Sequence, residues 1–106
     1  MHVTTWNNGQ HYCTGAGYGF KLRADDRDRH FKKTWTTVFV ALPGVAEEVE
    51  FNINKSSFWG GTCRELINRV FGQWLIQRGY APWSSGAPPK FDLVLVRANH
   101  FKLADK

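Results

Sequence analysis

The most regular hydrophobic pattern in the chain lies at residues 62–79, TCRELINRVFGQWLIQRG. Its large apolar side chains have the i, i+1, i+4, i+5 spacing of one wide helical face, and they are Leu66, Ile67, Val70, Phe71, Trp74 and Leu75. Thr62 and Glu65 have the spacing of a capping box, and Gly79 suits the left-handed residue that often follows a helix. The pattern predicts one long helix over residues 62–78, whose apolar face a sheet must cover.

Apolar stretches, some of them alternating with polar residues, predict the strands of that sheet. These strands fall at residues 18–23, 34–42, 48–54, 91–97 and, as a short edge strand, 101–103. The strands at 34–42 and 91–97 are apolar on both faces, which is typical of strands buried on both sides. One helix covers only one face. The other face therefore needs the N-terminal residues, the loop at 80–90 or a second subunit, which makes a homodimer one of three solutions.

The N-terminal residues 1–13 contain Asn8-Gly9, the pair that most favours a two-residue hairpin turn. The flanking residues are β-prone, so a short hairpin is expected there. Together the elements predict an α+β fold. We expect a mostly antiparallel sheet of about five strands, with one long amphipathic helix packed on one face. A chain of 106 residues forms a single domain, residues 1–106, with one core.

Composition narrows the class of protein. A hydrophobic content of 42% and an aromatic content of 15% fit a folded globule and argue against disorder. No apolar run is long enough to cross a bilayer, and the first ten residues lack the features of a signal peptide. Cys13 and Cys63 are too few for a disulfide framework, so we expect free thiols in the cytoplasm. No histidine or cysteine spacing is typical of a metal site, and we expect no cofactor.

The net charge of +5 is unevenly distributed. Residues 21–33 hold three aspartates and six basic residues, which are Lys21, Arg23, Arg27, Arg29, Lys32 and Lys33. Lys21 and Arg23 share a strand face, and the other four follow in a charged connector with room for one helical turn. Nearby aromatic residues that offer surfaces for base stacking are Tyr18, Phe31 and Trp35. The pattern fits a nucleic-acid partner, or else a solvated surface on which aspartates neutralise the arginines.

Two other sets of residues indicate different functions. Asp28 and His30 are candidates for the acid–base pair of a small ribonuclease-like hydrolase, although no second histidine or paired carboxylate completes that site. Trp59, Tyr80 and Trp83 flank the predicted helix, where they either form a ligand or self-assembly surface or close the ends of the core. The leading hypothesis is a small non-enzymatic module that binds nucleic acid. A protein-interaction module and a hydrolase are the alternatives.

Overall fold

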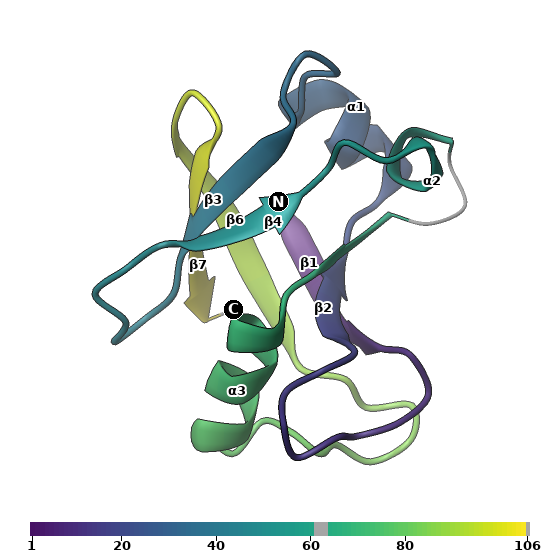
Figure 1. Cartoon of the computed structure of the whole chain (residues 1–106), viewed down its shortest axis with the longest axis vertical. Helices are drawn as coiled ribbons and strands as arrows, with labels where there is room; N and C mark the ends of the chain where they lie inside the picture. The colour runs from purple at the N-terminus through teal and green to yellow at the C-terminus, as the bar shows by residue number, and fades with distance from the viewer. Residues whose placement is uncertain (61–63, 106) are drawn as a thin grey trace.

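The computed structural model describes residues 1–60 and 64–105, which form a curved mixed sheet and three short helices (Figure 1). The strands are β1 (His2–Asn7), β2 (Tyr18–Lys21), β3 (Thr37–Ala41), β4 (Val49–Asn52), β5 (Glu65–Ile67), β6 (Lys90–Arg97) and β7 (His100–Asp105). The helices are α1 (Ala24–His30), α2 (Ser56–Trp59) and α3 (Arg69–Gln77). The fold is α+β as expected, but within this part of the chain seven strands replace the predicted five and three short helices replace one long helix.

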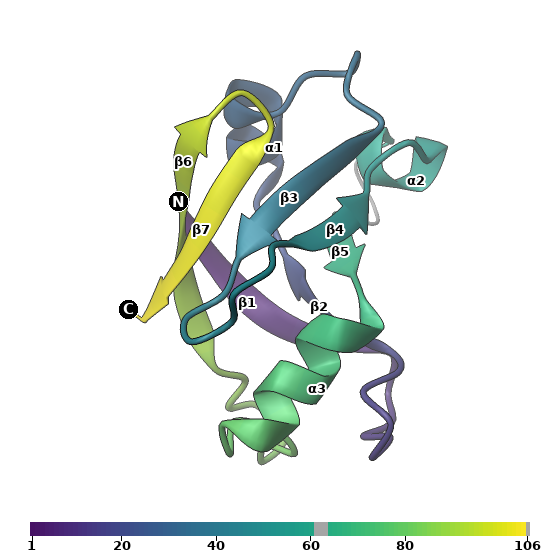
Figure 2. The same cartoon turned by 60° about the vertical axis from the view of Figure 1, so that its left-hand side comes forward.

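The sheet has the strand order β4-β3-β7-β6-β1-β2-β5 and is nearly closed into a barrel. Only the β3–β7 pair is parallel among the strand pairs that the structure describes. The two end strands, β4 and β5, approach each other (Figure 2). The Asn68 side-chain amide bridges this gap by donating to the Glu50 carbonyl oxygen at 2.6 Å. Helices α1 and α2 lie at one end of the barrel and α3 at the other.

The core is aromatic and lies inside the barrel. Phe20 on β2 packs edge-on against Phe51 on β4 and Phe71 on α3, with ring centroids 5.1 and 5.4 Å away. Near α1 and α2, Phe31 stacks on Phe101 with centroids 5.0 Å apart. Helices therefore plug the barrel ends with aromatic side chains. None of the helices in the described ranges is long and apolar enough to cross a lipid bilayer.

The predicted helix over 62–78 is wrong in its first part. Glu65–Ile67 is strand β5, and α3 begins only at Arg69. The N-cap is Asn68, whose side-chain oxygen accepts from the Val70 N–H at 2.7 Å. Glu65 therefore does not lie in the first turn, and Thr62, its predicted capping partner, lies outside the described residues.

The reason for this strand is its pairing with β2. Leu66 is the register partner of Phe20, and both are fully buried. Gly19 lies so close to the Leu66 carbonyl that a side chain there would collide with it, so glycine lets β5 approach. The second part of the prediction is confirmed for Phe71, Trp74 and Leu75, which are buried, and the chain turns at Gly79 with φ of +78°. It is wrong for Val70, which is exposed although it was expected on the buried face.

The other predicted strands have mixed outcomes. The antiparallel β3–β4 hairpin is confirmed. The short N-terminal hairpin within residues 1–13 is wrong, because residues 10–13 form no strand and β1 pairs instead with β2, across a connection formed by residues 8–17. Strand β7 is not an edge strand, since it lies between β6 and β3. The expected two-sided burial of the strand at 91–97 is wrong for its second half, where three apolar side chains are exposed: Val94, Leu95 and Val96.

Candidate nucleic-acid interface

A cleft of about 240 Å³ opens beside strands β6, β1 and β2. Its lining residues are His2, Val3, Thr4, Lys21, Leu22, Arg23, Arg64 and Lys90. Four of the chain's 14 lysines and arginines therefore meet in one place. No aspartate or glutamate of the described residues belongs to this lining. The cleft is the most basic hollow that we identify in the described part of the protein.

Strand register explains how the two lysines come together. Lys90 on β6, Thr4 on β1 and Lys21 on β2 are consecutive Cα partners across three neighbouring strands. Side chains alternate between the faces of a strand, and the adjacent residues Phe91 and Phe20 are buried in the core. The lysines must therefore face outward. Two strand spacings separate their Cα atoms by about 10 Å, with the short Thr4 side chain between them.

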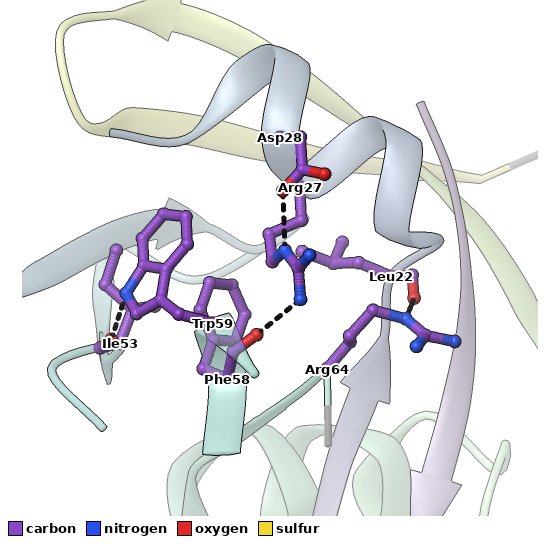
Figure 3. Close-up of polar contacts among 7 residues, drawn as sticks. All are labelled: Leu22, Arg27, Asp28, Ile53, Phe58, Trp59 and Arg64. Carbon is purple, nitrogen blue, oxygen red and sulfur yellow. Dashed lines mark hydrogen bonds and ion pairs between the residues drawn. The ribbon is translucent and has the colours of Figure 1, made fainter. Parts of the chain in front are cut away.

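Two arginines join Lys21 at the end of β2. The Arg64 Nε–H donates to the Leu22 carbonyl oxygen at 2.9 Å (Figure 3). In return, the Leu22 N–H donates to the Arg64 carbonyl oxygen at 3.1 Å. This reciprocal pair ties the segment before β5 to β2. Arg23 is the N-cap residue of α1 and is exposed, and its side chain forms no capping hydrogen bond. Three cations therefore surround one strand end.

Two carboxylates border this basic group and partly offset it. At one rim, His2 Nδ1 lies 2.5 Å from Asp92 Oδ1, since the two are cross-strand partners. On β5, Glu65 is the register partner of Lys21. Glu65 is buried, and its Oε2 has no hydrogen-bond partner within the described ranges. The four lysines and arginines still outnumber the two carboxylates, so the cleft keeps an excess of positive charge.

The structure divides the six basic residues predicted to bind nucleic acid. Lys21 and Arg23 line the cleft, whereas Arg27 is buried beneath α1. The Arg27 Nη1–H donates to the Phe58 carbonyl at 2.8 Å, and its Nε lies 2.9 Å from Asp28 Oδ1 (Figure 3). Its guanidinium also lies 6.0 Å from the ring centroid of Trp59. Arg27 therefore joins α1 to α2 and holds the fold together.

The remaining three basic residues are exposed and lie outside the cleft. Arg29 lies on α1, and Lys32 and Lys33 follow it. None of the three contributes to the lining of the cleft. Lys33 Nζ lies 6.0 Å from the ring centroid of Trp59. The basic segment 21–33 thus supplies two surfaces, one on a strand end and one around a helix.

The predicted acid–base pair is not assembled in this structure. Asp28 is mostly exposed and is paired with Arg27, and His30 is half-buried at the end of α1. Among the described residues, no hydrogen bond or ion pair joins Asp28 to His30. Asp28 is paired with Arg27, which is itself bonded to the Phe58 carbonyl, and not with His30.

The aromatic residues singled out around the helix lie at opposite ends of the barrel. Trp59, in α2, donates its Nε1–H to the Ile53 carbonyl at 3.0 Å. At the α3 end, Tyr80 stacks on Trp74 with centroids 5.7 Å apart, and Trp83 packs edge-on against Tyr18 at 5.6 Å. All three of the predicted residues pack against the core. They do not share one pocket.

The three aromatic residues expected to stack on bases are also engaged in the fold. Tyr18 and Phe31 are buried, and Trp35 packs against Phe101 in the core. The Tyr18 hydroxyl lies 2.7 Å from His11 Nδ1, and burial raises the pKa of this hydroxyl above its usual value near 10. Tyr18 and Phe31 are therefore buried in the barrel and not accessible to bases, and the half-buried Trp35 packs against the core.

Sequence reasoning missed Trp6, Arg64 and Lys90. Trp6 shares the outer face of β1 with Thr4, and the alternation in HVTTWN carries that signal, because Val3 and Thr5 are the buried residues. Arg64 and Lys90 join the cleft only through strand pairing, for which the local sequence gives no signal. Within the described ranges, no group of three histidine, cysteine or acidic residues could hold a metal ion.

The geometry of the cleft is the basis for inferring what it binds. The cleft brings four cations together beside β6, β1 and β2, and the half-buried Trp6 lies on the same outer face of β1 as Thr4. It offers no assembled acid–base pair among the residues predicted for that role. The chain matches no family model, no curated protein and no solved structure.

Proposed function

We propose that the protein binds nucleic acid by holding its phosphate backbone in the basic cleft. The observation that supports this most is the meeting of Lys21, Arg23, Arg64 and Lys90 in one hollow whose described lining contains no acidic side chain. Lysine and arginine bind phosphates and release counterions from the nucleic acid, which drives association. The excess of positive charge also speeds the encounter with a polyanion.

The spacing of the cations is compatible with a chain of phosphates that crosses the strands. Lys21 and Lys90 are separated by two strand spacings, or about 10 Å between Cα atoms. A backbone that crosses the strands can therefore contact both lysines through different phosphates. Arg64 is held in place through its Nε, so it enters the site already oriented.

The test compares two double variants that remove the same charge. In Lys21→Gln/Lys90→Gln the cleft loses two cations, and in Lys32→Gln/Lys33→Gln the surface after α1 loses two. Affinity for labelled oligonucleotides of about 12 nucleotides is measured by fluorescence anisotropy between about 50 and about 200 mM salt. The wild type should lose affinity steeply as salt rises. The cleft variant should bind more weakly, with a salt slope smaller by about two, because each phosphate contact contributes about one.

The control variant should keep nearly the whole slope, because its lysines lie outside the cleft. Two results count against the proposal. One is the absence of binding by the wild type at the lowest salt. The other is an equal loss of affinity in both double variants, which reports net charge and no particular site.

A further inference from the structure

Trp6 has an unusual environment among the tryptophans of this protein. Trp74 is buried in the core, and Trp35, Trp59 and Trp83 pack against it. Trp6 belongs to neither group, although it is half-buried. Strand β1 sends Val3 and Thr5 inward, which leaves Trp6 on the outer face. A large aromatic ring is therefore held on the outside of the barrel without a role in the core.

The position of Trp6 relates it directly to the cleft. Thr4 and Lys21 are cross-strand partners in the cleft lining, and the next outward-facing pair is Trp6 with Gly19. Trp6 is thus the diagonal neighbour of Lys21, about 7–8 Å away between Cα atoms. Gly19 has no side chain to cover the ring from β2. On the following strand, the Gly19 partner Ile67 is exposed as well.

A cation and an aromatic ring at this spacing are the two parts of a single-strand site. Such sites combine a positive groove that follows the backbone with aromatic side chains on which bases stack. Every base has a π-face, so this contact tolerates any sequence, but in a duplex the neighbouring bases cover those faces. We propose that the cleft binds single-stranded nucleic acid, with phosphates at Lys21 and Lys90 and a base stacked on Trp6. This inference rests on the proposed function.

The experiment separates base stacking from phosphate binding. The two probes are an oligothymidylate of about 12 nucleotides and an abasic strand of the same length, which has the same phosphates and no bases. The wild type should bind the base-bearing strand more tightly by about five- to 150-fold, the range expected for one stacked base. It should also prefer this strand to a duplex of equal length.

Two variants of Trp6 test the residue itself. Trp6→Leu should reduce the preference for the base-bearing strand to near unity and leave the salt slope unchanged, because no charge is lost. Trp6→Phe keeps a smaller ring and should retain part of the preference. Thermal unfolding checks that both variants are folded, which we expect because Trp6 lies outside the core cluster.

The outcomes distinguish this inference from the proposed function. A Trp6→Leu protein that keeps the full preference for bases overturns the role of Trp6. A wild type that binds the abasic strand and the duplex as tightly as the oligothymidylate overturns single-strand recognition, while the cleft still stands as a polyanion site. Absence of binding to all three probes at low salt overturns the proposed function itself.

Discussion

The basic cleft and the basic region around α1 share the segment 21–33, but the cleft also includes Arg64 and Lys90 from distant parts of the sequence. The two regions differ in what holds their charges. In the cleft, Lys21 and Lys90 extend from strands whose other faces form the core. In the region of α1, Arg27 turns inward and is used by the fold, while Arg29 remains outside. Basic residues that are close together in the sequence therefore do not all lie on the protein surface. The period of the secondary structure decides which cations face solvent.

Arg27 points inward, where it donates a hydrogen bond to a carbonyl oxygen of α2. Helix α2 is only one turn long, from Ser56 to Trp59, and the last carbonyl groups of any helix lack partners within it. The Arg27 guanidinium donates to one of these, the Phe58 carbonyl, while its side-chain stem lies buried under α1. Its ion pair with Asp28 contributes little, because the Asp28 side chain is 63% exposed. The hydrogen bond, more than the charge pair, accounts for the buried arginine.

The largest expected effect tests this division of roles. Arg27→Met keeps the buried stem but removes every donor, so the Phe58 carbonyl loses its partner. We expect a loss of about 2–4 kcal/mol in the free energy of unfolding, measured by urea denaturation. Arg29→Met, on the same helix but exposed, is the control and should change stability by less than about 0.5 kcal/mol. Equal effects of the two substitutions contradict a structural role for Arg27.

The fold could be predicted where the pattern is local and not where it depends on pairing. Phe71 and Trp74 face the core as their helical spacing indicates. The predicted helix over 62–78 is too long because Glu65–Ile67 fits the helical spacing of the residues that follow it. Three residues are too few to indicate a strand by alternation. What makes this segment a strand is its approach to Gly19 on β2, a contact between distant parts of the chain.

The candidate site, like the fold, could be predicted from the sequence only where its residues are neighbours along the chain. Lys21 and Arg23 could be predicted because they are close in sequence, although β2 ends at Lys21 and Arg23 is the N-cap residue of α1. Arg64 and Lys90 reach the cleft through the pairing of β5 and β6 with their neighbours, which no local pattern reveals. Trp6 was within reach, because the alternation along β1 places it opposite the buried Val3 and Thr5. The distribution of charge along the sequence does not point to it.

A smaller effect is expected from Tyr18, which lies on the core-facing side of β2, opposite the side that carries Lys21. Burial raises the pKa of the Tyr18 hydroxyl, so above about pH 10 the unfolded chain loses a proton that the folded chain keeps. The free energy of unfolding should therefore fall as pH rises beyond that value, and this contribution is fully present at lower pH. Tyr18→Phe should remove this part of the fall. It should also cost about 1 kcal/mol at neutral pH, because the hydrogen bond with His11 is lost.

Denaturant unfolding of the wild type and of Tyr18→Phe, measured at about pH 7 and about pH 11, checks the result on either side of the usual tyrosine pKa. Affinity for oligonucleotides at neutral pH should be unchanged, since Tyr18 faces the core and Lys21 faces the cleft. An unchanged dependence on pH in the variant contradicts the assignment of the titration to Tyr18. A large loss of affinity contradicts the separation of the two faces.

The smallest expected effect compares two single arginines. Arg23→Gln removes a cation from the cleft lining, and Arg29→Gln removes one from the exposed side of α1. Both variants should stay within about 0.5 kcal/mol of the wild-type stability, so their binding can be compared directly. Arg23→Gln should lower the salt slope by about one and Arg29→Gln by clearly less. Equal slopes place α1 within the binding surface, and the ligand then follows the whole basic segment 21–33 instead of crossing the strands.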